Sequence, residues 1–392
     1  MKKDTDCTFS RRSFLRIAGV GSTILPSALR GVFAQSPAFK TQRVVIIVFG
    51  GGVRTLDAFG FNYDTQRQDR TPNARSLMEL GLKEGAMFPA TRAAGGSHYG
   101  ASLAIFTGVP EGMTERSMQR TLNPTVFEYV RKQKNLDANH VWLVASSPGQ
   151  SLNFGHSVHP DYGARYGANV LSPEGLLNPA LAQAAQRHGV QPDDAAADAV
   201  HRLRSALNAA PPEGFASDAS TTRQMERRLM QMLNDAKPFT GVNAADARTM
   251  AVATDILKTV KPLVLGVHLD NADIAHTSYR NYLQVISDND RAIQQMMNTI
   301  KADPQLKDST TVFILPEFGR DAGSPNKFGG LDHISPSLHL GYVTLVVWGP
   351  DVKKGIYNKE ISAADVCPTA CYLLGVKAEH AKGRVLTEVL AQ

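Results

Sequence analysis

The sequence predicts an α/β fold in which helices cover both faces of a mostly parallel central sheet. Apolar runs rich in Val, Ile and Leu occupy residues 44–49, 262–269 and 310–315, and continuous runs of this kind are typical of strands buried on both faces of a parallel sheet. Segments with apolar residues at three- and four-residue spacing separate them, which favours helices between the strands. Because open parallel sheets bind ligands beyond the carboxyl ends of their strands, we expect a functional site at that edge.

An export signal is predicted ahead of the first strand. Residues 10–16 read Ser-Arg-Arg-Ser-Phe-Leu-Arg, an apolar stretch follows at 17–29, and residues 32–34 (Val-Phe-Ala) offer a small-residue cleavage site. This order is typical of a twin-arginine signal. We therefore expect removal of residues 1–34, the twin-arginine export machinery as a partner, and a periplasmic or secreted mature protein. Since no run of about 18 apolar residues follows, we expect no stable membrane span in the mature chain.

Charge and cysteine content narrow the class of protein further. The full chain carries a net charge of +6, and residues 1–34 hold six Lys or Arg and two Asp or Glu, so the chain without them carries +2. This small excess gives little support for a nucleic-acid partner, and we expect none. Cys367 and Cys371 are four residues apart on a predicted helix. We interpret them as buried apolar thiols, with a disulfide as the alternative.

The first predicted strand, residues 44–49, ends at three glycines, 50–52. These glycines allow a tight turn but lack the further spacing of a dinucleotide-binding fingerprint, which disfavours a nucleotide-binding Rossmann-like protein. A helix is then predicted to begin with Thr71 as its cap and Pro72 at its first helical position, and to end at Gly81 or Gly85.

Two polar residues precede the next predicted helix. Residues 95–100 read Gly-Gly-Ser-His-Tyr-Gly and open an apolar helix over 101–106. The free amide groups and dipole of a helix N-terminus favour negative charge, so this segment is a natural position for an anion. Ser97 and His98 lie at that position.

A helix-rich insertion is predicted in the middle of one α/β domain that spans residues 35–392. A strand over 141–145 leads to a loop that contains His156 and His159, which we interpret as loop residues. From about 165 to 260 the chain is rich in Ala, Gln and Arg. We predict that this segment forms a cap over the site.

Acidic and imidazole side chains gather where the later strands end or begin. The run 262–269 leads to three such residues at 270, 273 and 276, the run 310–315 leads to one at 317, and two more at 332 and 333 precede the run 343–348. Carboxylates and imidazoles are ligands of divalent cations, and three histidines favour zinc or manganese over calcium. The predicted metal ligands are Asp57, Asp270, Asp273, His276, Glu317, Asp332 and His333. A turn or capping role is the alternative for Asp57 and Glu317.

The order of these pieces resembles the superfamily of alkaline phosphatases, sulfatases and nucleotide phosphodiesterases. The resemblance rests on segments 71–73, 106–111, 365–369 and 373–376 and on Gly383, in that order. The segments 317–320 (Glu-Phe-Gly-Arg) and 330–333 (Gly-Leu-Asp-His) are most similar to a branch of twin-arginine-exported proteins of unknown function. The resemblance implies an alkaline-phosphatase-like three-layer sandwich, with the insertion outside the shared part.

The resemblance also implies roles for site residues, and the sequence departs from several of them. The superfamily carries a Ser, Thr or modified Cys nucleophile nine residues before the Thr of Thr107-Gly108, where this chain has His98, flanked by Ser97. Gly50 replaces the metal-binding Asp expected after the first strand, and Glu317-Phe318 replaces an expected Asp-His pair. One of the two usual metal positions is therefore poor in ligands.

The second metal position has more candidate ligands in the sequence. It could be built from Asp270 or Asp273, from His276, and from His333 or His339. The sequence alone leaves these alternatives open.

Taken together, these residues predict an exported metal-dependent hydrolase or transferase of phosphate or sulfate esters. Its substrate would be an anionic ester, held by Arg54 or Arg320, and its covalent intermediate would form at Ser97 or His98. The alternative is a catalytically degraded superfamily member that acts as a periplasmic binding or envelope-assembly protein, because the expected Asp and Asp-His ligands are absent from the sequence.

Overall fold

The computed structural model describes residues 39–112, 120–147, 153–173, 239–323, 325–326 and 329–391. The predicted signal, residues 1–34, and the central part of the predicted insertion, residues 174–238, lie outside these ranges.

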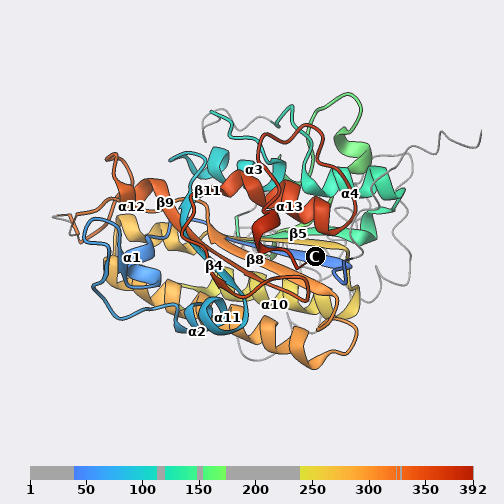
Figure 1. The fold of residues 1–392 in the computed structure, drawn as a ribbon. Helices are drawn as coiled ribbons and strands as arrows, with labels where there is room; N and C mark the ends of the chain where they lie inside the picture. Colours follow the sequence, from blue (N-terminus) through green and yellow to red (C-terminus); the bar gives the residue numbers. More distant parts are fainter. Residues whose placement is uncertain are drawn as a thin grey trace, which may run out of the picture. The chain divides into compact units, whose positions relative to one another are not determined.

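A nine-stranded sheet forms the centre of the described part (Figure 1). The strands run in the order β10-β4-β9-β8-β1-β7-β5-β6, and β11 also pairs with β4. All of these pairings are parallel except those of β9 with β8 and with β4. This confirms the predicted α/β fold with a mostly parallel sheet. The strands are β1 Arg43–Phe49, β4 Ala86–Arg92, β5 Val141–Ala145, β6 Asn169–Leu171, β7 Val264–Leu269, β8 Thr310–Pro316, β9 Tyr342–Trp348, β10 Gly355–Ile356 and β11 Ile361–Ser362, with β2 Phe61–Asn62 and β3 Arg67–Gln68 as a separate hairpin.

Helices cover both faces of the sheet and make three layers. Figure 1 shows α3, α4 and α13 on one face and α2, α10 and α11 on the other. Alternate residues of β1 enter two separate apolar clusters, Val45 and Ile47 on the α10–α11 side and Val44 and Ile46 on the α3–α13 side, because successive side chains of a strand point to opposite faces. The helices are α1 Thr55–Ala58, α2 Arg75–Glu79, α3 His98–Thr107, α4 Val126–Lys134, α10 Ala244–Thr259, α11 Tyr279–Ala302, α12 Leu338–Gly341 and α13 Val366–Leu373. Shorter turns of helix are η1 Leu80–Glu84, η2 Ala138–His140, η3 Gly163–Tyr166, η4 Asn271–His276, η5 Ala363–Asp365 and η6 Thr387–Val389.

The reversed strand β9 explains how residues that precede a strand reach the carboxyl edge of the sheet. β9 is antiparallel to β8, with Phe313 opposite Val347. Its first residue therefore lies at the edge where β1, β7 and β8 end. The loop before β9, which carries Asp332 and His333, thus reaches the edge predicted for the site.

The predicted start of the helix at Thr71 is wrong. The helix α2 begins at Arg75, and its N-cap residue, Ala74, supplies no side-chain cap. Instead the Asp290 carboxylate of α11 accepts hydrogen bonds from the backbone N–H groups of Ser76 (3.0 Å) and Leu77 (2.8 Å). A tertiary contact has therefore replaced the local cap that the sequence indicated.

Both ends of the segment predicted as an insertion contain elements that pack with the sheet. The short strand β6 adds to the sheet beside β5, and α10 packs in the core through Met250, Ala253 and Ile256. Residues 169–171 and 244–259 thus belong to the sandwich. The prediction also missed β4, whose pairing with β9 is irregular between Phe88 and Thr91, around Pro89, because a proline inside a strand disfavours that assignment.

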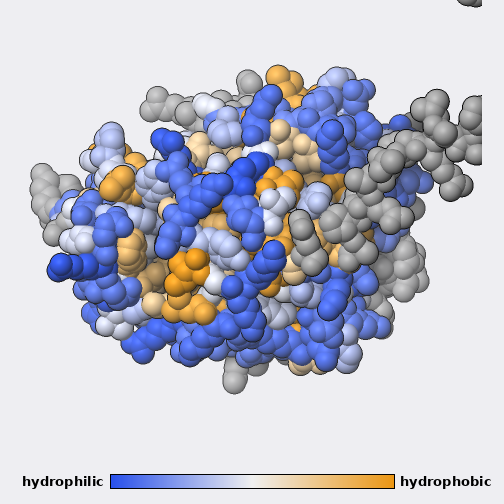
Figure 2. Space-filling view, viewed as in Figure 1, coloured by the Kyte–Doolittle hydropathy of each residue, from blue (hydrophilic) through white to orange (hydrophobic). Residues whose placement is uncertain are grey.

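Two expectations about the rest of the chain can be compared with the described residues. Cys367 and Cys371 are buried free thiols on α13, in agreement with their interpretation as apolar thiols. No described helix is both long and apolar enough to cross a bilayer. On the face seen in Figure 2, hydrophilic side chains cover most of the described surface, and hydrophobic ones lie in small separate groups.

Candidate metal centre

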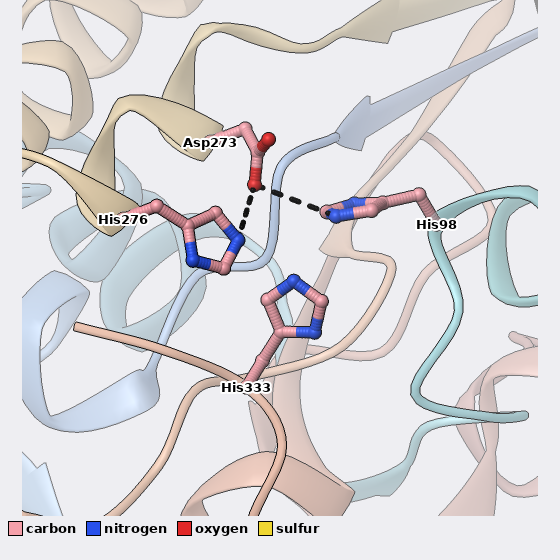
Figure 3. Close-up of side chains that lie close together, drawn as sticks. All are labelled: His98, Asp273, His276 and His333. Carbon is pink, nitrogen blue, oxygen red and sulfur yellow. Dashed lines mark ion pairs between the residues drawn. The ribbon is translucent and has the colours of Figure 1, made fainter. Parts of the chain in front are cut away.

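Four side chains from three separate segments converge at the carboxyl edge of the sheet. They are His98, Asp273, His276 and His333, and their potential ligand atoms all lie within 4.8 Å of one another. Figure 3 shows the three imidazole rings and the carboxylate turned toward a shared centre. We refer to these four residues as the metal cluster. The sequence predicted three of them as metal ligands and the fourth, His98, as a catalytic residue.

The helical turn η4 supplies two members of the cluster directly after β7. Asp273 and His276 are three residues apart, and in a 3₁₀ turn side chains at this spacing lie on one side. Their closest polar atoms, His276 Nε2 and Asp273 Oδ1, are 3.2 Å apart. The buried Asp246 carboxylate of α10 fixes the start of this turn, because it accepts hydrogen bonds from the backbone N–H groups of Asp270 (2.9 Å) and Asn271 (3.2 Å).

His98 is the first residue of α3, and Glu317 contacts its ring on the side away from the cluster. The Nδ1 atom of His98 lies 2.6 Å from Glu317 Oε1, and its Nε2 atom lies 3.4 Å from Asp273 Oδ1. Glu317 follows β8, is fully buried, and also accepts hydrogen bonds from Gly51 N–H (2.7 Å) and from the Ser102 hydroxyl. The structure therefore places Glu317 behind the His98 ring and outside the four converging residues, and this disfavours the predicted ligand role.

Asp332 has the same relation to His276. Its Oδ1 atom lies 2.8 Å from His276 Nδ1, on the side of the ring opposite Nε2. Asp332 is thus outside the cluster, although the sequence predicted it as a ligand. Histidines that bind metals usually donate their second ring N–H to a carboxylate or carbonyl, which fixes the ring. Two of the three cluster histidines have this arrangement, and no described residue partners Nδ1 of His333.

Arg320 connects the loops that carry the cluster and is not free to bind a substrate anion. Its guanidinium is fully buried and lies 3.0 Å from Asp273 Oδ1. It also donates hydrogen bonds to the backbone carbonyls of Gly51, Gly52, Ala272 and Leu331. These partners inside the protein disfavour the predicted clamp role of Arg320.

Asp57 belongs to a different charged group. Its carboxylate lies 2.8 Å from Arg54 Nε and 3.1 Å from Arg70 Nη1, and it accepts a hydrogen bond from the Tyr279 hydroxyl at 2.7 Å. Arg54 uses its remaining donors on the carbonyls of residues 321–323. Because Arg54 and Asp57 pair with each other, their contacts disfavour the predicted ligand role of Asp57 and the predicted clamp role of Arg54.

The remaining predicted residues lie beside the cluster or apart from it. Asp270 is at the start of η4, and burial raises its pKa to about 6. Ser97 is the N-cap of α3 and its hydroxyl oxygen accepts from Gly100 N–H at 3.5 Å. His339 is buried, with Nε2 3.1 Å from Asn62 Oδ1, so of the two alternatives His333 joins the cluster.

The two loop histidines also lie outside the cluster. The Nδ1 atom of His156 bonds the carbonyl of Ser157 at 2.8 Å, and Nδ1 of His159 accepts from Asp161 N–H. Both make local bonds, as expected of loop residues.

The charges around the cluster favour a bound dication. Asp273, Glu317 and Asp332 contact its histidines, while among the described residues Arg320 is the only Lys or Arg in an ion pair with any of the three carboxylates. With neutral imidazoles this leaves two negative charges. A divalent cation would balance them, which fits the mixed imidazole and carboxylate donors.

The pKa shifts follow from the same shortage of positive charge. Burial lowers the pKa of His98, but the Glu317 and Asp273 carboxylates outweigh it and raise that pKa to about 10. Burial raises the pKa of Asp273, but His98 and Arg320 outweigh it and lower that pKa to about 2. Before a cation binds, a proton on His98 therefore supplies part of the missing positive charge.

Sequence reasoning missed two buried polar residues beneath the cluster, Ser102 and His268. Ser102 lies one helical turn after His98, so a His-x-x-x-Ser spacing on the predicted helix could have indicated a shared face. His268 lies inside β7 and is fully buried. A histidine in the middle of an apolar strand was the signal that could have drawn attention to it.

Comparison with known proteins shows the fold. Wild-type alkaline phosphatase PafA matches with a TM-score of 0.52 at 13% identity, over 89% of this chain and 99% of that one. The lipoteichoic acid synthase LtaP from Listeria monocytogenes gives 0.52 at 10% identity, over 91% and 77%. The phosphonate monoester hydrolase of Agrobacterium radiobacter gives 0.50 at 13% identity, over 89% and 77%. No protein-family model and no curated protein matches the sequence.

These structures share the alkaline-phosphatase-like sandwich and confirm the predicted fold class. The likeness to a twin-arginine-exported branch stays a prediction.

Packing explains why Gly50 stands where the resemblance implied an aspartate. A Cβ atom at Gly50 would lie 1.9 Å from the backbone carbonyl oxygen of Leu269 and 2.9 Å from the His268 ring. No side chain fits there unless β7 moves. In this chain the end of β1 is therefore closed by backbone and by His268.

Proposed function

We propose that this protein is an exported metal-dependent hydrolase or transferase that acts on phosphate or sulfate esters. The observation that carries the proposal is the convergence of three imidazoles and one carboxylate at the carboxyl edge, with two of the rings held by carboxylates behind them. The fold supports it, because solved structures with this sandwich include a phosphatase and a phosphonate monoester hydrolase.

Asp273, His276 and His333 would hold the cation throughout, and Nε2 of His98 would be a fourth ligand until an ester takes its place. This donor set favours zinc or manganese. A bound dication stabilises the negative charge that develops on the oxygens of a phosphate or sulfate ester during transfer. Three protein ligands with one open position are typical of catalytic zinc sites. The twin-arginine-like residues 10–16 support export to the periplasm.

His98 is the residue to which we assign covalent attack. Its Nδ1 atom faces Glu317, which leaves the Nε2 lone pair toward the cluster, whereas the Ser97 hydroxyl caps α3. Nε2 forms a bond to phosphorus or sulfur as the ester P–O or S–O bond breaks, and the departing alkoxide takes a proton from solvent. Water then cleaves the N–P or N–S bond and restores His98, or an alcohol does so in a transferase.

A second candidate function is a metal-holding binding protein without turnover. The observation that favours it is that His98 lies as close to Asp273 as a fourth ligand would require. Four protein ligands around zinc are typical of structural sites.

Metal analysis joined to turnover of aryl phosphate and aryl sulfate panels separates these functions. We expect about one zinc or manganese per chain, measurable turnover of one panel, and loss of that metal to a chelator. Less than one metal per chain together with no turnover would overturn the proposal. One bound metal without turnover would establish the binding protein instead.

A matched pair of variants tests the attacking group. His98→Ala should abolish turnover, while Ser97→Ala should keep it within about tenfold, since a lost helix cap costs stability more than chemistry. The covalent adduct trapped from wild type should be acid-labile, as an N–P bond is. An acid-stable adduct that is absent from Ser97→Ala would assign the step to Ser97.

A further inference from the structure

A line of three fully buried polar side chains lies beneath the metal cluster: Glu317, Ser102 and His268. His268 Nε2 lies 2.9 Å from Ser102 Oγ, and the Ser102 hydroxyl donates to Glu317 Oε2. The line then reaches His98, whose Nδ1 atom lies 2.6 Å from Glu317 Oε1. The line joins three elements, because Ser102 is in α3, His268 is in β7 and Glu317 follows β8. Gly51, which follows β1, adds a fourth, since its N–H group donates a hydrogen bond to Glu317.

The hydrogen bonds of this line run in one direction. Because the Ser102 hydroxyl proton is given to Glu317, Ser102 can only accept from His268, which must therefore carry its proton on Nε2. The other ring nitrogen, Nδ1 of His268, is buried and has no partner among the described residues. A proton on that atom would be a buried donor without an acceptor, so His268 is a neutral imidazole.

Glu317 consequently receives hydrogen bonds on both oxygens and donates none. Oε1 accepts from Gly51 N–H at 2.7 Å, and Oε2 accepts from Ser102. A carboxylate with this set of partners is ionised, so His98 must present Nδ1–H to it. Since His268 is neutral, the positive charge that balances Glu317 is an additional proton on His98 in the metal-free protein and the cation itself once one is bound to Nε2.

We propose that Glu317, with Ser102 and His268 behind it, is the positioning residue of the metal centre. It fixes His98 as the tautomer whose proton is on Nδ1 and directs the Nε2 lone pair into the cluster. Helix geometry supports this role, because His98 and Ser102 are four residues apart on α3 and hold the two oxygens of one carboxylate. The inference rests on the proposed metal site.

The chain offers a matched control in Glu128 on α4. Glu128 is also fully buried and accepts hydrogen bonds from Thr125 N–H, Ser157 N–H and the Ser157 hydroxyl. None of these partners belongs to the metal cluster. Glu128→Gln and Glu317→Gln thus make the same chemical change in two buried, hydrogen-bonded settings.

Cobalt(II) binding, followed by its visible spectrum, tests the inference without any measurement of activity. We expect Glu317→Gln to lower cobalt affinity about 10- to 100-fold, the usual effect of losing a carboxylate behind a metal-bound histidine, and to change the spectrum of the bound ion. Glu128→Gln should lower thermal stability and leave both affinity and spectrum as in wild type. Ser102→Ala should lower affinity in the same direction but less, and it serves as the test if Glu317→Gln does not fold.

The two proposals fail in different ways. Wild type that binds no cobalt contradicts the proposed metal site. Wild type that binds cobalt, with the Glu317 or Ser102 variant unchanged in affinity and spectrum, overturns the positioning role alone.

Discussion

Two acidic groups at the same edge of the sheet differ in how their charge is balanced. Asp57 is buried and meets Arg54, Arg70 and the Tyr279 hydroxyl. Asp273 is 46% exposed and meets two histidines and Arg320, and further carboxylates lie behind both histidines. Asp57 is therefore neutralised within the protein, whereas the surroundings of Asp273 retain an excess of negative charge.

The difference teaches that location at the carboxyl edge does not by itself make a carboxylate a metal ligand. Both residues follow strands or turns where parallel sheets bind ligands. What separates them is whether arginines or neutral imidazoles surround them. Substitutions and changes of pH test this distinction, and the largest effects are expected at the two aspartates themselves.

Asp57→Asn should be the more damaging change for stability. It leaves the buried Arg54 guanidinium without its ion-pair partner, and breaking a buried pair in this way costs about 3–5 kcal/mol. Urea unfolding of the metal-free protein measures the loss. Cobalt affinity should stay at the wild-type value, and a lowered affinity in the folded variant would show that the two groups are coupled.

Asp273→Asn should be the more damaging change for metal binding. Loss of a carboxylate that only orients a metal-bound histidine lowers metal affinity about 10- to 100-fold. Asp273 would contact the metal directly, so we expect Asp273→Asn to lower metal affinity more than about 100-fold. Because the side chain is about half exposed, the urea midpoint should move much less than in Asp57→Asn. Competition titration against a chelator measures the affinity, and a change below tenfold would remove Asp273 from the site.

Metal affinity should rise with pH by about tenfold per unit between about pH 7 and 10. The titratable groups near His98 are Glu317, Asp273, Asp270 and His333, and the Glu317 and Asp273 carboxylates raise its pKa to about 10. Metal binding requires a free lone pair on Nε2, so at pH 7 it must displace one proton from His98.

Calorimetry in two buffers of different ionisation enthalpy measures this proton release. Equal binding enthalpies in both buffers would mean that no proton leaves. In a folded His98→Gln variant the dependence on buffer should disappear.

The sequence alone predicted much of the cluster but not how its members work together. The strand over 262–269 and the residues that follow it were enough to indicate His276 and one of Asp270 and Asp273, because acidic and imidazole groups at the end of a buried strand must be paired or hold a cation. The resemblance to the superfamily, whose nucleophile precedes the Thr of Thr-Gly by nine residues, singled out His98. By contrast, Glu317 and Asp332 were predicted as ligands because sequence gives residue types near an edge and no distances between them.

The amino-acid sequence by itself determined the central strands β1, β5, β7, β8 and β9, since continuous apolar runs are stable only when both faces are covered. It also determined that acidic and imidazole groups follow those strands. The tertiary structure alone decided that β9 runs in reverse and brings His333 to the site, that Arg54 and Arg70 neutralise Asp57, and that Glu317 lies behind His98. These outcomes depend on distances between groups far apart in the chain, and such distances set charge balance and hydrogen bonding only after the layers have packed.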